Sequence, residues 1–270
     1  MMRAGTPDSP CIPSEAAANS LASNRSQPAA AQLKLALVIP TLCEAKNIGG
    51  LLVHVSSVLN PLRIPYEILV VDDDSSDGTG DAVLAIASDN PHVRLIVRKG
   101  ERGLAGAVID GWRQSDGDVF GVMDADLQHP PEMLTQLYAA IQDGCDLAIG
   151  SRYTPGGKTE KWHPVRKLLS TVAVWAAWPL QQARLRVKDP MAGFFMVRRH
   201  CVDHLQPQRT GFRLLLDTLV RGHIDSVREI PIAFGLRSRG ASKANFRIGW
   251  DYAKLLAKLY AWRCGWRRLR

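Results

Sequence analysis

The chain has 270 residues, 46% of them hydrophobic, which is enough for one large α/β domain with appendages. Its five cysteines are odd in number and lack paired spacing, which argues against a disulfide framework or a zinc site and for a reducing compartment. The net charge of +8 is uneven: residues 237–270 hold ten Lys or Arg and one acid, so this tail carries +9. Such a tail should meet an anionic partner, namely a phosphorylated substrate, an anionic membrane surface or nucleic acid.

Residues 1–32 are rich in Ala, Ser, Pro, Asn and Gln and have no apolar periodicity, so we predict a disordered leader. The leader has no hydrophobic signal core. No run of about 18 apolar residues follows anywhere, so no membrane-spanning helix is predicted.

Buried strands and helices alternate along the next part of the chain. Strands are predicted at 33–40, 66–71, 93–97, 118–123 and 145–149, and helices at 45–59, 79–88, 103–114 and from Pro130 onward. This alternation indicates βαβ units, an α/β fold class and a mostly parallel sheet.

The order changes after Ser151. We predict a loop at 151–161, an amphipathic helix at 162–180, a strand at 193–197, a helix at 211–221, a strand at 227–234 and a basic loop at 236–246. A last helix, 248–266, has Trp and Leu on one face and Lys and Arg on the other, as in helices that lie in a membrane interface. The predicted units are a leader (1–32), one domain (33–247) and a basic helix (248–270).

Two carboxylates, Asp124 and Asp126, follow the buried strand at 118–123, with Gln128 and His129 close behind. The carboxyl ends of strands form the ligand-binding edge of an open α/β sheet. Paired hard oxygen donors suit Mg²⁺ or Mn²⁺, although single acids at strand ends are more often helix caps or turn residues. For His129, a structural hydrogen bond is the favoured interpretation.

A second acidic cluster, residues 72–77, ends the strand at 66–71 and begins with Asp72 and Asp73. It is either a loop of turn formers or a site where carboxylates accept hydrogen bonds from a base or ribose. Both clusters face the same sheet edge and would repel each other without cations or donors between them. A nucleoside diphosphate with a metal ion fits that gap.

Basic side chains recur near the same edge. Arg152 follows the strand at 145–149, and Arg166 and Ser170 share one face of the helix at 162–180. Arg237 and Lys243 lie in the basic loop, and arginine binds phosphate through a planar fork. Asp217, on the helix at 211–221, is either an active-site acid or a surface charge.

Several motifs together resemble glycosyltransferase family 2. They are IPTLCEAKNI (39–48), VVDDDSSDGT (70–79), GLAGAVIDGW (103–112), MDADLQHPPE (123–132), GSRY (150–153), DPMAGFFMVRR (189–199) and RSRGASK (237–243). The last three narrow the resemblance to the polyprenol- or dolichol-phosphate mannosyltransferase branch. The resemblance covers about 33–243 and departs from the family pattern at Leu42, Cys43 and Asp217.

The resemblance implies a GT-A fold, a nucleotide-sugar donor such as GDP-mannose, a divalent cation and a polyprenyl phosphate acceptor. It implies nucleotide-sugar contacts at Pro40, Glu44, Asp72, Asp73, Asp124, Asp126, Gln128, Arg237 and Lys243. It implies metal ligands at Asp124, Asp126 and Gln128, and lipid-phosphate contacts at Arg152, Arg166 and Ser170. The residues expected to carry catalysis are Asp126, Arg152, Arg237 and Lys243.

A phosphate acceptor is largely ionised near neutral pH, so in-line transfer needs no strong base and should invert the anomeric carbon. The alternatives are a UDP-sugar donor, a glycan-extending enzyme with Asp217 as base, and a basic nucleic-acid-binding protein supported only by the tail. We expect no nucleic-acid partner. We expect a cytoplasmic protein, peripheral on the cytoplasmic face of a membrane, which a membrane-anchoring partner protein could also hold there.

Overall fold

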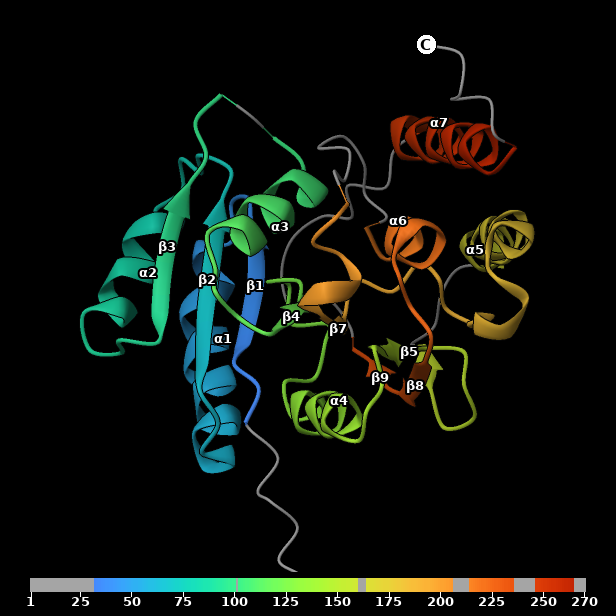
Figure 1. Cartoon of the computed structure of the whole chain (residues 1–270). Coiled ribbons are helices and arrows are strands. Elements are labelled where there is room, and N and C mark those ends of the chain that lie inside the picture. Colours follow the sequence, from blue (N-terminus) through green and yellow to red (C-terminus); the bar gives the residue numbers. More distant parts are fainter. Residues whose placement is uncertain (1–31, 101, 160–163, 206–213, 236–245, 265–270) are drawn as a thin grey trace, which may run out of the picture. The chain divides into compact units, whose positions relative to one another are not determined.

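The computed structural model describes residues 32–100, 102–159, 164–205, 214–235 and 246–264 (Figure 1). The predicted leader falls almost wholly outside these ranges. The basic loop with Arg237 and Lys243 also lies outside them.

A seven-stranded sheet forms the centre of the domain, in the order β3-β2-β1-β4-β7-β5-β8. Its strands are β1 (Leu35–Thr41), β2 (Tyr66–Asp72), β3 (Val93–Val97), β4 (Val119–Val122), β5 (Leu147–Ser151), β7 (Phe195–Arg198) and β8 (Val227–Pro231). Only β7 is antiparallel to its neighbours, β4 and β5. The mostly parallel sheet of an α/β fold is therefore confirmed. Two short strands, β6 (Lys158–Thr159) and β9 (Ala233–Phe234), pair separately.

The helices cover both faces of the sheet (Figure 1). They are α1 (Ala45–Leu59), α2 (Thr79–Ala87), α3 (Leu104–Arg113), α4 (Met133–Gln142), α5 (Pro164–Ala177), α6 (Leu214–Arg221) and α7 (Phe246–Arg263). Alternate strand residues point to opposite faces. Leu37 accordingly packs in a core with α1, α2 and α4, whereas Val38 packs in a core with α3 and α6. Burial on both sides explains why these strands are apolar throughout.

Three predicted boundaries need correction. The helix expected from Pro130 is α4, which begins at Met133, and the two prolines form turns that precede it. A residue before proline is disfavoured from the helical region, which explains the delay. The helix at 162–180 ends at Ala177, ahead of Pro179, and the strand at 227–234 is divided into β8 and β9.

Helices α5 and α7 lie beside each other, next to α6 (Figure 1). The Tyr252 hydroxyl of α7 donates to the Ala173 carbonyl of α5 at 2.6 Å, and the Tyr260 hydroxyl donates to the Ala176 carbonyl at 2.9 Å. Two tryptophans remain largely uncovered there: Trp175 is 71% exposed and Trp262 is 43% exposed. The pair of helices therefore presents aromatic side chains to the surroundings.

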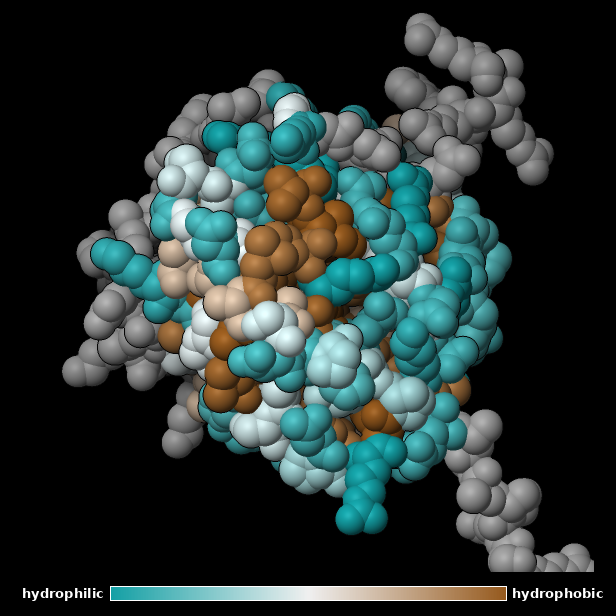
Figure 2. Space-filling model, turned by 90° about the vertical axis from the view of Figure 1, so that its left-hand side faces the viewer, coloured by the Kyte–Doolittle hydropathy of each residue, from teal (hydrophilic) through white to brown (hydrophobic). Residues whose placement is uncertain are grey.

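The opposite side of the sheet ends at β3, whose outer edge pairs with no other strand among the described residues. Figure 2 views the molecule from this side and shows apolar side chains gathered on it. Leu84 of α2 and Val97 of β3 are about half exposed. Arg94 is also exposed on β3 and donates to Glu67 and to the Gln114 carbonyl. A charge on an edge strand opposes further strand pairing.

Candidate active site

The loops after β1, β2 and β4 share one edge of the sheet, because these strands are parallel neighbours. Each loop contains one non-glycine residue with a left-handed backbone: Cys43 (φ 59°), Asp74 (φ 57°) and Leu127 (φ 62°). Such conformations cost about 1–3 kcal/mol each and cluster at active sites. The strain marks the same edge that the acidic motifs predicted.

The carboxylate of Asp72 organises its own loop. It is 2% exposed, and its Oδ1 accepts hydrogen bonds from the hydroxyls of Thr41 (2.8 Å) and Ser75 (2.6 Å). Its Oδ2 accepts the Ser75 N–H at 2.8 Å. Glu44 lies close by, just before α1, and Pro40 lies half-buried in β1. The predicted nucleoside contacts Pro40, Glu44 and Asp72 therefore do lie together at this edge.

Asp73 faces the next loop instead. Its Oδ1 accepts a hydrogen bond from Arg98 Nη1 at 2.6 Å, and its Oδ2 accepts the Gly103 N–H at 2.7 Å. The Nε of Arg98 also donates to Asp110 at 2.9 Å. Arg98 is 8% exposed and was not singled out from the sequence. Its position directly after β3, at the same edge, was the signal that could have identified it.

The loop after β4 holds the predicted metal ligands. Asp124 follows the strand, and Asp126 is 6% exposed with its Oδ1 accepting the Gln128 N–H at 3.2 Å. The Gln128 side chain donates to the Gly235 carbonyl at 2.9 Å, and the Gly235 N–H donates back to the Gln128 carbonyl at 3.0 Å. These two hydrogen bonds join the acidic loop to Gly235. Gly235 is the last described residue before the basic loop that contains Arg237.

The backbone at Gly193 lies close to the Asp124 carboxylate, and the missing side chain of this glycine leaves room for it. A Cβ at residue 193 would lie 2.9 Å from Asp124 Oδ2, which is closer than real side chains come. A side chain at residue 193 would therefore force the Asp124 carboxylate to shift. In the sequence, Gly193 stands out only as part of a motif, since no local pattern indicates what a glycine will contact.

His129 is buried next to the acidic loop and packs against two phenylalanine rings. It is 3% exposed, stacks on Phe194 with ring centroids 5.1 Å apart, and meets the edge of Phe234 at 5.4 Å. Burial lowers the pKa of His129 to about 4. The neutral ring accepts the Asp124 N–H at Nδ1 (3.3 Å), so its proton sits on Nε2, 4.0 Å from Asp124 Oδ2. This agrees with the structural role favoured for His129.

Arg152 lies directly after β5, as predicted, and forms a two-pronged ion pair with Asp189. Its Nε and Nη2 donate to the carboxylate at 2.7 and 2.8 Å, and its backbone N–H adds a third bond at 3.1 Å. Burial alone would lower the pKa of Arg152, but its hydrogen bonds to fully buried Asp189 outweigh that effect and raise the pKa. Asp189 was predicted only as part of the motif at 189–199 and not as a partner of Arg152.

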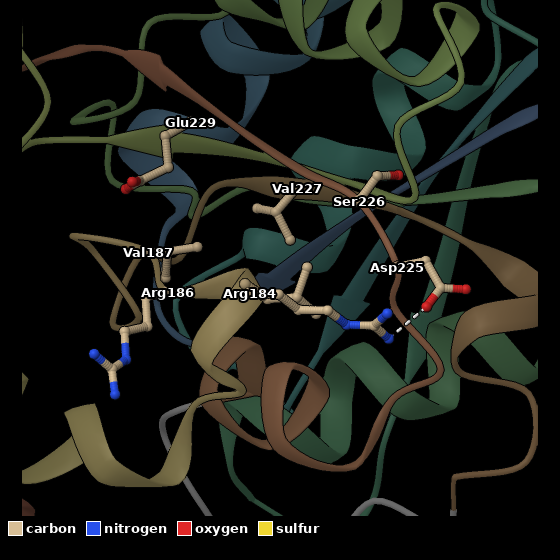
Figure 3. A pocket seen from close by; sticks show the side chains of 8 residues that line it. Arg184, Arg186, Val187, Asp225, Ser226, Val227 and Glu229 are labelled. Atoms are coloured by element: carbon tan, nitrogen blue, oxygen red, sulfur yellow. Dashed lines mark hydrogen bonds and ion pairs between the residues drawn. The ribbon is translucent and has the colours of Figure 1, made fainter.

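Glu229 holds the Asp189 segment in place. Its carboxylate accepts the N–H groups of Lys188 (2.9 Å) and Asp189 (3.1 Å). Glu229 also lines a surface pocket of about 300 Å³, together with Arg184, Arg186 and Asp225 (Figure 3). Glu229 therefore connects the lining of this pocket to the backbone of Asp189.

Three further predicted residues lie on helices α5 and α6. Arg166 and Ser170 lie four residues apart in α5, so they share a helix face, and their side chains are outside the described structure. Asp217 is 7% exposed and forms an ion pair with Arg221 in α6, with Nε to Oδ1 at 2.7 Å. Both carboxylate oxygens of Asp217 thus accept hydrogen bonds from the Arg221 guanidinium.

The acidic loop fits a hard divalent cation. Its oxygen donors are two carboxylates, Asp124 and Asp126, and the side-chain carbonyl of Gln128, whose amide nitrogen is already fixed on Gly235. The nearby imidazole of His129 turns Nδ1 to the backbone. Oxygen ligands without sulfur or nitrogen suit Mg²⁺ or Mn²⁺.

Known proteins resemble the chain in both sequence and fold. The dolichol-phosphate mannosyltransferase of Pyrococcus furiosus is 41% identical over 230 residues, which cover 85% of this chain and 64% of that protein. The Saccharomyces cerevisiae dolichol-phosphate mannosyltransferase is 32% identical over 243 residues, 86% of this chain and 89% of that protein. The chain thus spans less than two thirds of the archaeal relative.

A solved structure extends the comparison to the fold. Glucosyl-3-phosphoglycerate synthase of Mycobacterium tuberculosis, in complex with Mn²⁺, uridine diphosphate and glucosyl-3-phosphoglycerate, matches with a TM-score of 0.60 at 19% identity, covering 86% of this chain and 80% of that one. The expected GT-A fold is confirmed. The family model described as Glycosyl transferase family 2 matches residues 36–205. With strand-end carboxylates, sheet order and family match in agreement, the chain belongs to glycosyltransferase family 2.

Proposed function

We propose that this protein transfers mannose from GDP-mannose to a polyprenyl phosphate, with inversion at the anomeric carbon. The observation that carries the proposal is the closeness of an acidic loop to a buried arginine. The ring of Phe234 contacts His129 beneath the acidic loop at 5.4 Å and the Arg152 guanidinium at 5.4 Å. One edge of the sheet therefore offers a cation site for a donor diphosphate beside a cationic site for a second anion.

The donor would occupy the edge formed by the loops after β1, β2 and β4. Glu44, Asp72 and Asp73 would border the nucleoside, where carboxylates and backbone groups can accept base and ribose hydrogens. Asp124, Asp126 and Gln128 would hold the divalent cation, which supplies charge neutralisation for the departing diphosphate. Arg237 and Lys243, in the segment that continues from Gly235, would add positive charge there.

The acceptor phosphate would bind at Arg152, with Arg166 and Ser170 contributing from α5. Asp189 fixes the Arg152 fork, and a pre-oriented cation loses little freedom when an anion arrives. A phosphate monoester is already ionised near pH 7, so the chain needs no general base. The remaining task of these residues is to bring two anions together and align the acceptor oxygen, which would yield a β-linked product from an α-linked donor.

The names of the relatives support this substrate pair, since both are dolichol-phosphate mannosyltransferases. The Asp217–Arg221 ion pair speaks against a glycan-extending enzyme that would use Asp217 as its base. The fold by itself does not select the nucleotide of the sugar donor, because the mycobacterial synthase of the same fold was crystallised with uridine diphosphate.

We further propose that α5 and α7 rest on the cytoplasmic surface of a membrane. Trp175 is 71% exposed, Trp178 47% and Trp262 43%, and lysines of α7 are exposed nearby. Aromatic and basic side chains on one pair of helices suit an interface with anionic lipid. Within the described residues, every helix falls short of the length and apolarity that crossing a bilayer needs.

A transfer assay tests the reaction. GDP-mannose, GDP-glucose and UDP-glucose are each offered with polyprenyl phosphate, with Mg²⁺, with Mn²⁺ and with a chelator. We expect cation-dependent transfer from GDP-mannose and a β-linked product. Preferred use of UDP-glucose would overturn the donor assignment, and retention of configuration would overturn the mechanism.

Two sets of variants accompany the assay. Asp126→Asn should lower the rate by about 10³-fold, since metal-assisted charge stabilisation contributes several kcal/mol, while leaving the unfolding midpoint unchanged. For the membrane, Trp175→Ser combined with Trp262→Ser should reduce flotation with anionic liposomes. The matched control is Leu84→Ser with Val97→Ser on the opposite side, and equal loss in both pairs would contradict the membrane proposal.

A further inference from the structure

A second cluster of metal-ligating side chains lies at the other end of the sheet. Asp146 directly precedes β5, and His200 and Cys201 lie in the short 3-10 helix, Arg199–Cys201, that follows β7. Because β5 and β7 are antiparallel, with Leu147 paired to Val197, the start of one strand meets the end of the other. The cluster is therefore at the sheet edge opposite Asp124 and Arg152, and it belongs to neither predicted substrate site.

The three ligand atoms are close enough to share one ion. His200 Nε2 lies 3.4 Å from Cys201 Sγ and 3.9 Å from Asp146 Oδ1, and all three atoms lie within 4.8 Å of one another. In a tetrahedral zinc site, bond lengths of about 2.3 Å to sulfur and about 2.0 Å to nitrogen place these two ligands roughly 3.5 Å apart. The sulfur–nitrogen distance already matches that spacing.

The Asp146 carboxylate is oriented toward the other two ligands. Its Oδ2 accepts hydrogen bonds from the N–H groups of Asp225 (2.9 Å) and Ser226 (3.0 Å) and from the Ser226 hydroxyl (3.2 Å). Asp225 and Ser226 are seen at the rim of the pocket in Figure 3. Fixing one oxygen in this way aims the other at His200, which is how outer partners commonly orient a metal ligand.

The ligand types select the class of ion. One sulfur, one imidazole nitrogen and one carboxylate oxygen suit zinc and similar ions, whereas Mg²⁺ prefers oxygen alone. The exposed His200 ring leaves an entry path, while Cys201 is fully buried. Without an ion, burial raises the pKa of the Cys201 thiol to about 12, so binding would release its proton.

We propose that Asp146, His200 and Cys201 bind one divalent ion of the zinc class, with water as the fourth ligand, and so fasten the start of β5 to the end of β7. Spacing alone gave no sign of it, because Asp146 and His200 are 54 positions apart. The site is independent of the proposed transferase activity. Its failure would leave that proposal untouched.

Cobalt titration of the metal-free, untagged full chain tests the site. Co²⁺ bound through a thiolate gives a near-ultraviolet charge-transfer band and strong tetrahedral visible bands, whereas the all-oxygen loop at Asp124 and Asp126 can give neither. We expect one equivalent of Co²⁺ to produce both bands and one equivalent of Zn²⁺ to bleach them. The absence of a thiolate band in the unaltered protein would overturn the proposal.

Variants assign the ligands. Cys201→Ser should abolish the thiolate band, whereas Cys145→Ser, which alters a neighbouring buried thiol, and Cys264→Ser, which alters an exposed one, should keep it. Should Cys201→Ser not fold, the exposed His200→Ala decides: we expect its Co²⁺ affinity to fall roughly tenfold or more, with His54→Ala unchanged. Unaltered affinity in His200→Ala, or a band that survives Cys201→Ser, refutes the site.

Discussion

Two buried arginine–carboxylate pairs lie at the candidate active-site edge, one in each half of the sheet. On the β3 side, Asp73 is held by Arg98 at 2.6 Å, and on the β5 side, Arg152 is held by Asp189 at 2.7 Å. In the first pair the sequence indicated the carboxylate, Asp73, and in the second it indicated the arginine, Arg152. In both, the partner was overlooked, although it is buried just as deeply.

The difference between the halves lies in what surrounds each pair. The Arg98 guanidinium also binds Asp110 and the Gly103 carbonyl, so two carboxylates and backbone groups surround it. The Arg152 guanidinium instead lies against the rings of Tyr153 and Phe234, at 5.3 and 5.4 Å. Asp124 also acts on the charge of Arg152, so each guanidinium has two carboxylates near it. The halves therefore share a construction and differ in the aromatic rings that pack against Arg152.

The largest expected effect comes from breaking the Arg152–Asp189 pair on the β5 side. Asp189→Ala leaves Arg152 buried without its counter-ion, and removing one partner of a buried pair costs about 3–5 kcal/mol. Urea unfolding should show that loss in free energy of unfolding. The control is Asp203→Ala, which breaks the exposed Arg199–Asp203 pair and should cost under about 1 kcal/mol. Equal losses in both variants would mean that the Arg152 pair is open to solvent.

His129, beneath the acidic loop between the halves, should make stability depend on pH. Its pKa is about 4 when folded and near 6.5 when unfolded, so the unfolded chain takes up the proton first on acidification. Stability should fall by about 3 kcal/mol between pH 6.5 and pH 4 relative to His129→Asn, and the two should run parallel above pH 7. Unfolding curves at each pH measure this. Parallel behaviour throughout would contradict a buried neutral ring.

Double variants sharpen the comparison. Arg152→Met with Asp189→Asn, and Arg98→Met with Asp73→Asn, each remove both charges and should recover about 1–3 kcal/mol relative to the sum of the single changes. The first double should raise the KM for polyprenyl phosphate and the second the KM for the nucleotide sugar. If both doubles raise the same KM, the division into donor and acceptor halves is wrong.

The smallest expected effect concerns Gly193. A Cβ there would displace the Asp124 carboxylate, so Gly193→Ala should raise the cation concentration needed for half-maximal transfer by about tenfold, or roughly 1.4 kcal/mol. Gly50→Ala serves as the control, because nothing lies within 4 Å of a Cβ at that exposed position of α1. It should stabilise the protein by about 0.5–1 kcal/mol without changing the cation requirement. An unchanged requirement in Gly193→Ala would remove Gly193 from the site.

The sequence by itself determined the class of fold and placed most of the candidate site residues at one edge of the sheet. Continuous apolar strands alternating with helices predict a parallel sheet, and parallel strands bring their carboxyl ends together. For that reason the sequence alone assigns Asp72, Asp73, Asp124, Asp126 and Arg152 to one edge. Local chemistry and strand direction suffice for that inference.

Only the tertiary structure decided the partners. Asp189 and Arg152 are 37 positions apart, Gly235 and Gln128 are 107 apart, and Gly193 reaches Asp124 through the antiparallel insertion of β7. Such pairings depend on strand order and packing across the sheet. The periodicity of the sequence does not encode these pairings. It indicates which face of a strand or helix a residue occupies, and not which distant residue lies on that face.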